Sequence, residues 1–254
     1  MKTSVSILIT LMTFTSCFCA KGLPIKQTTN QVQEQNQKAI IDHSAWDKLL
    51  KTYVADNGDV DYKGFKNNAV ALNKYINYLA SQVPTEQWSK QEQLAYFINV
   101  YNANTIKLII DHYPTKSIKD IKNPWLKNRI KIGEKEFSLS GIENGILRKM
   151  NEPRIHFAIN CASVSCPKLL NTAYTADNVD ALMEQATKAF IQNTDKNKIS
   201  ENRIQLSKIF QWYKGDFKDS GSLIDYVNQY TTIKINPDAK VDYLEYDWNL
   251  NEQN

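Results

Sequence analysis

The sequence has few cysteines and histidines, and it has no block of charge of one sign. Its 254 residues include 4 Cys and 3 His, and 31 basic and 27 acidic residues alternate along the chain to give a net charge of +4. Nucleic-acid-binding domains usually gather basic residues on one face, so this pattern gives no indication of a nucleic-acid partner. The chain also lacks an internal repeat, a heptad array and a glycine-rich phosphate loop. Nothing therefore indicates a repeat protein, a coiled coil or a phosphate-loop enzyme.

The sequence also lacks an apolar run long enough to cross a membrane. Its first twenty residues contain the lone cation Lys2, an apolar run over 5–14, and then small residues with two cysteines. The run is too short to span a bilayer, and this order is typical of a secretory signal. FTSC, residues 14–17, resembles a loose bacterial lipobox, which predicts lipidation of Cys17. Ordinary signal cleavage near residues 19–20 is the alternative.

The N-terminal pattern predicts an exported protein with one folded domain. We expect a signal peptide over 1–20, a flexible tether over 21–40, and one globular domain over 41–254. The tether is rich in Gln, Asn, Thr and Lys and has too few apolar residues to form a core. The predicted location is the periplasm or the surface of a bacterium, with the N-terminal lipid as the only attachment to the membrane. Disulfides persist there, so two cysteines that meet would oxidise.

The order of the predicted elements favours an α+β fold. Apolar spacing predicts helices over 44–56, 66–81 and 88–114, and the last is apolar on nearly every face, as expected of a buried central helix. Residues 129–140 predict a hairpin, and 153–160 predict a short apolar strand. The remaining predicted elements are helices near 140–150, 176–192, 209–217 and 222–230, and strands at 203–207 and 241–250. Helices come first and mixed elements follow, so we expect the central helix to pack on a small antiparallel sheet.

HFAINCASVSCPKLL, residues 156–170, gathers one histidine and two of the cysteines. If 153–160 is a strand, His156 and Cys161 face apart and lie roughly 16 Å from one another. The four residues that follow Cys161 can turn the chain back and bring Cys166 beside the strand. This geometry makes Cys166 the better partner for the histidine.

Cys166 also has a predicted position that would activate its thiol. Pro167 suits the first turn of a helix, so Cys166 is expected at the N-cap, where the helix dipole lowers the pKa of a thiol. His156 would then act as the base, and a carboxylate would orient it. Glu143 and Asp247 are the candidates for this carboxylate.

Two other arrangements of the cysteines stay open. A disulfide can join Cys161 and Cys166, because four intervening residues can close to the required Cα separation. The closed loop is small, so the bond would stabilise the fold by only about 2 kcal/mol. A structural zinc site is less favoured, because the spacing is wider than the tight pairs of such sites and no second pair exists. We therefore expect no metal and no cofactor.

Several polar residues fall in apolar surroundings. Buried amides need hydrogen-bond partners, so we expect Asn99 and Asn104 of the central helix to bond to neighbouring loops. Asn102 is expected to line the site. His43 precedes the first predicted helix and is expected in solvent.

The charged residue Arg148 has two interpretations. It could bind an acidic group of a ligand, or it could form a structural ion pair with Glu143 or Glu152. The structural pairing is favoured.

Long motifs of the chain resemble a known family. LAYFINVYNANTIKLI, GIENGILR, RIHFAINCASVSCPKL, LSKIFQWYKGDF and YLEYDWNLN, in this order and spacing, resemble the family called domain of unknown function 547. The resemblance extends from about Trp46 to the C-terminus. The family occurs in bacteria and in eukaryotes, including plants, and its biochemical role is not established.

The resemblance implies a fold similar to papain-like and transglutaminase-like cysteine peptidases. In those folds a catalytic cysteine heads a central helix and a histidine lies on a following strand, which would be His156. This chain departs from that pattern, because its central helix carries Asn102 and Ala103 and no cysteine. It also has Asn144 where the family pattern tends to have histidine.

Two classes of function are compatible with these residues. The first is a thiol-dependent hydrolase or acyltransferase acting on amide or ester bonds, with Cys166 as the nucleophile. Its site would contain the other residues discussed above, namely Asn102, Glu143, Arg148, His156, Cys161 and Asp247. The second is a non-catalytic binding or scaffold module of the cell envelope with a Cys161–Cys166 disulfide. Its recognition surface would use Trp212, Tyr213, Tyr246 and Trp248. The substrate or protein partner is not indicated by the composition.

Overall fold

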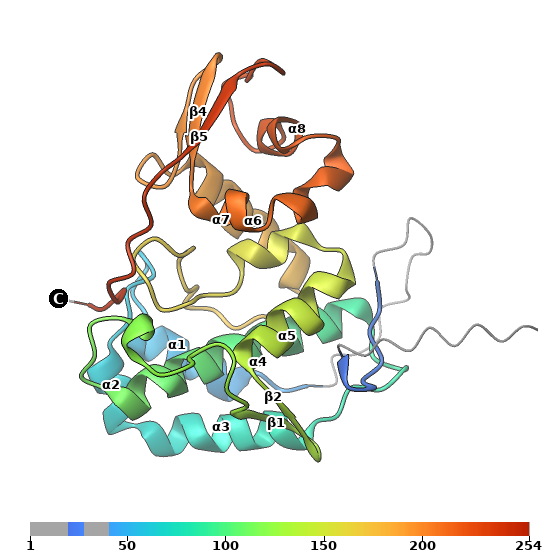
Figure 1. The fold of residues 1–254 in the computed structure, drawn as a ribbon. Coiled ribbons are helices and arrows are strands. Elements are labelled where there is room, and N and C mark those ends of the chain that lie inside the picture. Colours follow the sequence, from blue (N-terminus) through green and yellow to red (C-terminus); the bar gives the residue numbers. More distant parts are fainter. Residues whose placement is uncertain (1–19, 28–40, 254) are drawn as a thin grey trace, which may run out of the picture.

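The computed structural model of the chain describes residues 20–27 and 41–253 (Figure 1). The predicted signal peptide with Cys17 lies outside the described residues, except for its last position, and so does the predicted tether from 28 to 40. Within the described ranges, no helix combines the length and the hydrophobicity that crossing a bilayer requires.

The start of the predicted tether lies against the domain. Leu23 is buried, and the backbone N–H of Lys26 donates to the side-chain carbonyl of Gln93. The ring of Phe137 contacts the ammonium group of Lys21. These contacts place this part of the predicted flexible tether against the folded domain.

A long buried helix, α4 (Lys90–His112), lies at the centre of the larger apolar core. Ser89 starts the helix, because its hydroxyl accepts the backbone N–H of Glu92 and so satisfies a donor of the first turn. Neighbouring helices cover α4 on several sides, which explains why its apolar residues are not confined to one stripe. These helices include α2 (Tyr62–Asn67), α3 (Ala69–Ser81) and α5 (Leu139–Gly145), while α1 (Ser44–Tyr53) packs on α2 and α3. The predicted central helix is confirmed.

The C-terminal half of the chain forms a second apolar core (Figure 1, upper part). Serines cap two of its helices: Ser207 precedes α7, and Ser222 forms a capping box with Asp225 at the start of α8. In chain order the elements are α6 (Val179–Gln192), β3 (Lys198–Ile199), β4 (Arg203–Leu206), α7 (Lys208–Trp212), η5 (Lys214–Ser220), α8 (Leu223–Asn228) and β5 (Lys240–Tyr243). The structure is therefore α+β, as predicted.

The sheets differ from the predicted antiparallel sheet beneath the central helix. β1 (Ile130–Ile132) and β2 (Lys135–Phe137) form the predicted hairpin, and Gly133 turns the chain with a φ of +56°. In the three-stranded sheet, however, β4 pairs antiparallel with β3 and parallel with β5. This sheet belongs to the second core, whereas α4 packs mainly on helices.

The segment 153–160 is not a strand, and this prediction was wrong. Residues Pro153–Phe157 form a 3₁₀ helix, η4, because Pro153 suits a first turn and the carboxylate of Glu152 accepts the backbone N–H of Arg154. A run of apolar residues this short does not distinguish a strand from a buried helical turn. The alternation of faces predicted for His156 and Cys161 therefore does not apply.

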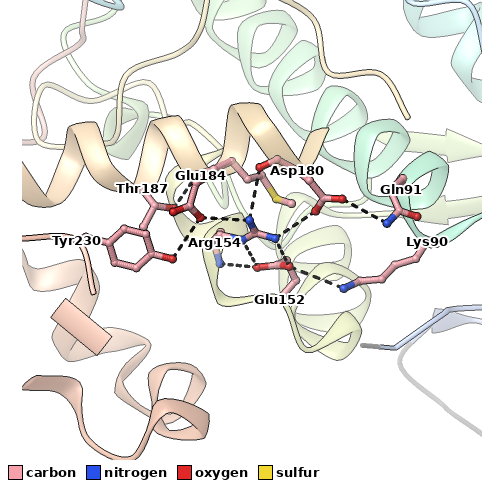
Figure 2. A network of polar contacts seen from close by, with 9 residues as sticks. Lys90, Gln91, Glu152, Arg154, Asp180, Glu184, Thr187 and Tyr230 are labelled. Atoms are coloured by element: carbon pink, nitrogen blue, oxygen red, sulfur yellow. Dashed lines mark hydrogen bonds and ion pairs between the residues drawn. The ribbon is translucent and has the colours of Figure 1, made fainter. Parts of the chain in front are cut away.

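A network of charged side chains fixes η4 against α6 and the start of α4 (Figure 2). The guanidinium of Arg154 donates to Glu152 at 2.8 Å, to Asp180 at 3.1 Å and to Glu184 at 3.3 Å. Lys90 approaches the same Glu152 carboxylate at 3.8 Å. These ion pairs and hydrogen bonds fix η4, the segment that contains His156.

Three other polar predictions have different outcomes. Asn99 bonds to a loop as expected, because its amide donates to the carbonyl of Tyr174 at 2.7 Å and accepts the N–H of the same residue. Asn104 instead donates within its own helix, to the carbonyl of Val100. His43 is buried rather than solvated, and its Nδ1 lies 2.7 Å from the hydroxyl of Tyr75.

Candidate functional site

A cavity of about 280 Å³ has a lining contributed by both apolar cores. From the first core come α4, α5 and the segment 159–167, and from the second come α7 and its neighbours. Polar and sulfur-containing side chains of the lining include Tyr101, Glu143, His156, Cys161 and Cys166. The cavity therefore brings together three of the residues that the sequence suggested for catalysis, Glu143, His156 and Cys166, and also Cys161, which it suggested for binding.

The loop that carries the cysteines is held by asparagine side chains. Asn102 of α4 donates to the carbonyl of Ala158 at 3.0 Å and accepts the backbone N–H of Asn160 at 2.8 Å. Asn160 in turn donates to the carbonyl of Pro167 and accepts the N–H of Ala162, both at 2.8 Å. Asn102 is thus a positioning residue for the loop, and it is not among the residues that line the cavity.

Both cysteines are free thiols, and they have different surroundings. The two sulfur atoms lie 2.9 Å apart, and the Cys161 sulfur also lies 3.2 Å from the Ser163 hydroxyl and 3.3 Å from the Tyr246 hydroxyl. The hydrogen bond with Cys166 is the main reason why the pKa of the Cys161 thiol lies below its ordinary value, and Ser163 and Tyr246 act in the same direction. Burial is the main reason why the pKa of the Cys166 thiol lies well above its ordinary value.

This reverses the roles predicted for the two thiols. No helix starts at Cys166, because the chain continues as irregular structure after Pro167, so the predicted dipole effect is absent there. Cys166 is 7% exposed, whereas Cys161 is partly exposed. Cys161 is therefore the thiol that the site favours as a thiolate.

His156 is oriented by a carboxylate that sequence reasoning missed. Its Nε2 lies 2.8 Å from Asp216 of η5, and its ring stacks on Tyr213 with centroids 4.0 Å apart. Nδ1 is buried and has no hydrogen-bond partner among the described residues. His156 makes no hydrogen bond to either sulfur within this part of the chain, although all three line the cavity.

Asp216 also binds Arg148, in a bidentate ion pair with distances of 2.6 and 2.7 Å. Burial raises the pKa of the Asp216 carboxyl, but the hydrogen bonds from Arg148 and His156 outweigh this and hold the pKa well below its usual range. Arg148 donates as well to the side chain of Asn144. The predicted pairing of Arg148 with Glu143 or Glu152 was therefore wrong.

Asp247 does not orient the histidine. Its side chain is exposed and accepts the backbone N–H of Asn249, and its own backbone N–H donates to the hydroxyl of Ser165 at 2.9 Å. These bonds attach the C-terminal segment to the cysteine loop, and they help to place Tyr246 beside Cys161.

Glu143 is buried against two tyrosines. The Tyr213 hydroxyl donates to one carboxylate oxygen, and the Tyr101 hydroxyl donates to the other at 3.3 Å. Burial and the neighbouring Glu143 raise the pKa of both tyrosines, so both hydroxyls stay protonated donors. No ion pair involves Glu143 in residues 20–27 and 41–253.

Aromatic side chains form one wall of the cavity. We call Trp125, Trp212, Tyr246 and Trp248 the aromatic wall. Trp248 lies at its centre, with ring centroids 4.5 to 5.8 Å from the other three. Trp212 is 46% exposed, so the wall extends from the cavity to the surface.

The sequence contained some signal for the missed residues. Asp216 lies in the motif QWYKGDF, which also contains the Tyr213 already expected at a recognition surface, and Ser163 lies between the two cysteines. Their partners, however, are up to 83 residues away along the chain, which only the fold reveals. The described part of the chain has no group of three His, Cys, Asp or Glu side chains placed to hold a metal ion.

The fold and the cavity define an α+β protein with a pair of thiols beside an aromatic wall. Residues 85–191 match the model of the family described as "Protein of unknown function, DUF547", which confirms the resemblance over this span. The span includes α4, α5, η4 and both cysteines, and it ends before Tyr213, Asp216 and Tyr246.

One curated protein is similar to a smaller part of the chain. "Transcription factor Y1" of Sorghum bicolor is 29% identical over 87 residues, which make up 31% of this chain and 23% of the relative. The chain thus matches less than a quarter of that relative's length. No solved structure matches the chain.

Proposed function

We propose that the cavity is the active site of a thiol-dependent hydrolase or acyltransferase acting on amide or ester bonds, with Cys161 as the nucleophile. The observation that carries this proposal is that a thiol with a lowered pKa lines the same cavity as His156, whose ring is oriented by Asp216. A thiolate is the nucleophilic form of cysteine, and a histidine fixed by a carboxylate is a common proton-transfer group.

In the proposed reaction, the thiolate of Cys161 attacks the carbonyl carbon of the substrate. The bond to the leaving amine or alcohol breaks, and His156 supplies the proton that this group takes. Asp216 fixes the ring through Nε2, which leaves Nδ1 as the nitrogen for proton transfer. Water or an amine then attacks the carbonyl carbon of the thioester and gives a proton to His156. The C–S bond breaks, which returns the thiolate of Cys161 and releases the acyl product. Once Cys161 has lost its proton, the thiol of Cys166, whose sulfur lies 2.9 Å away, is the group that would hydrogen-bond to the thiolate and stabilise it.

We also propose a distant relation to papain-like and transglutaminase-like folds, in which the nucleophile has moved from the central helix to the loop. The buried helix α4 supports this relation. Asn102 of this helix bonds to both ends of the segment 158–160, directly before Cys161. The helix would then position the nucleophile without supplying it.

We further propose that the protein is exported and anchored to the membrane by a lipid on Cys17, on the basis of its first twenty residues. Mass spectrometry of the N-terminal peptide from a membrane fraction tests this location. A lipid-modified Cys17, and release of the Cys17→Ala variant from the membrane, are expected. An N-terminus that still begins at Met1 would contradict export.

The proposed activity can be tested without knowledge of the substrate. We expect p-nitrophenyl acetate to leave an acetyl group on Cys161, detected by intact mass and peptide mapping, with a burst of p-nitrophenol. The Cys161→Ser variant should show neither the acetyl group nor the burst. The matched Cys166→Ser variant changes the sulfur 2.9 Å away, and its Cys161 should still be acetylated, but more slowly. Acetylation of Cys166 in the wild type, or of neither cysteine in the reduced protein, would refute the proposal.

A second candidate is a non-catalytic binding module with the two cysteines joined. The half-exposed Trp212 at the edge of the aromatic wall favours it, because tryptophan is common at recognition surfaces. In this case the unreduced protein should resist iodoacetamide and have a mass two hydrogens short. Alkylation of Cys161 in the protein as purified would exclude this candidate.

A further inference from the structure

Glu143 is a buried acid that the proposed chemistry does not use. It is 6% exposed, and two tyrosine hydroxyls donate to its carboxylate oxygens. An ionised carboxylate accepts hydrogen bonds and cannot donate them, which fits this arrangement. A buried charge is costly unless it is paired, and in the described residues no cation pairs with Glu143.

The guanidinium of Arg148 pairs with a different acid. Arg148 makes two hydrogen bonds to Asp216 and one to Asn144, and its guanidinium lies over the ring of Tyr213. In this ion pair, the positive charge of Arg148 and the negative charge of Asp216 neutralise one another. Glu143 therefore has no ion-pair partner in the part of the chain that the structure describes, and Arg148 acts on its charge only from beyond ion-pair distance.

The charge of Glu143 opposes the nucleophile. It raises the pKa of the Cys161 thiol, against the effect of the hydrogen-bond donors around that sulfur. A carboxylate at this place is unfavourable for a thiolate unless another group neutralises it. A cation brought by the ligand would do so.

The aromatic wall lines the same cavity as Glu143. Aromatic faces attract cations, and the electron-rich face of tryptophan does so most strongly. The protein already uses this attraction at Trp248, where the ammonium group of Lys119 lies 5.4 Å from the ring centroid. Tryptophan rings and a carboxylate beside one cavity suit an organic ammonium group, whose carbon atoms contact the rings while its charge faces the acid.

We propose that the cavity binds an organic ammonium group, with Glu143 as its counter-ion and the aromatic wall against its carbon atoms. The binding itself follows from the cavity alone. Its consequence rests on the proposed function: the ammonium group belongs to the substrate, and by neutralising Glu143 it favours the thiolate of Cys161.

The experiment compares choline with its neutral isostere 3,3-dimethylbutan-1-ol. Binding to the reduced full chain is measured by calorimetry and by tryptophan fluorescence. We expect choline to bind at least about tenfold more tightly than the isostere, and the Glu143→Gln variant to lose this preference. Glu245→Gln, a change at an exposed acid that pairs with Lys208, is the matched control and should keep it.

A second variant keeps the test decisive if Glu143→Gln does not fold. Trp212 is half exposed, so Trp212→Leu should fold and keep apolar contact. It should weaken choline binding more than binding of the isostere, because leucine has no aromatic face. Equal binding of choline and the isostere to the wild type would overturn the inference.

The two proposals can fail separately. Choline binding that depends on Glu143, without acetylation of Cys161, would leave the ammonium site standing and refute the proposed enzyme. Acetylation of Cys161 without any preference for choline would support the proposed enzyme and refute the ammonium site.

Discussion

Removal of the Tyr246 hydroxyl should raise the pKa of Cys161. This hydroxyl lies 3.3 Å from the Cys161 sulfur, and it is one of three side-chain groups whose hydrogen bonds lower the pKa of that thiol. A hydrogen bond to a charged group contributes about 1.5 to 3 kcal/mol, and about 1.4 kcal/mol corresponds to one pKa unit. Cys166 and Ser163 remain as donors in Tyr246→Phe, so we expect the lower end, a rise of about one unit. Below the pKa the thiolate fraction then falls about tenfold.

The assay is the rate of iodoacetamide labelling of Cys161 as a function of pH, followed by peptide mapping. The midpoint of the profile should move to higher pH in Tyr246→Phe, while the rate at high pH stays near that of the wild type. Tyr243→Phe is the control. Tyr243 ends β5, three residues before Tyr246, and its hydroxyl has no hydrogen-bond partner in the described chain. Superimposable profiles for wild type and Tyr246→Phe would refute the assignment of Cys161 as the stabilised thiolate, and so would faster labelling of Cys166.

Three further predictions concern proton transfer and stability. Asp216→Asn removes the carboxylate that orients His156, so it should slow acetyl transfer at Cys161 by about a hundredfold or more. Labelling of Cys161 by iodoacetamide needs no proton donor and should change little. Equal losses of rate in both assays would contradict this role of Asp216. Burial lowers the pKa of His43 to about 4 from 6.5, so the unfolded chain takes up a proton first as the pH falls. The contribution of neutral His43 to the free energy of unfolding is therefore complete above about pH 6.5 and declines by about 3 kcal/mol towards pH 4. Urea unfolding of the wild type and of His43→Gln over this pH range measures the contribution as a difference. Equal pH dependence of the two proteins would refute the prediction. Arg154→Met should lower the free energy of unfolding by about 2 to 4 kcal/mol, because the buried carboxylate of Glu152 loses its hydrogen-bonded partner and keeps only the more distant Lys90. An unchanged urea midpoint would show that the network of Figure 2 contributes little.

Much of the fold could be predicted because its signals are local. The central helix α4 has apolar residues on every face and a serine at its start, and the hairpin alternates around Gly133. The segment 153–160 was misassigned because five apolar residues fit a strand and a buried turn equally well. Pro153 and Glu152 contained the correct answer, since one suits a first helical turn and the other caps it.

The candidate site was predictable only in part, for a different reason. Glu143, His156, Cys161 and Cys166 were selected by residue type, and the cavity does bring them together. Their roles depend on hydrogen bonds that no local pattern contains. The carboxylate of Asp216 lies 60 residues after His156, and the hydroxyl of Tyr246 lies 85 residues after Cys161.

The same long-range contacts decide what the matched span 85–191 can do by itself. It contains the thiol loop and the asparagines that hold it, so it fixes where the two sulfur atoms lie. The hydroxyl that lies beside the Cys161 sulfur, from Tyr246, and the carboxylate that orients the histidine, from Asp216, both come from the second core. A protein that shares only this span with the chain would keep two adjacent thiols, but it would lack the groups that activate one of them. Since function depends on the site and not on the fold alone, chemistry at Cys161 requires both cores.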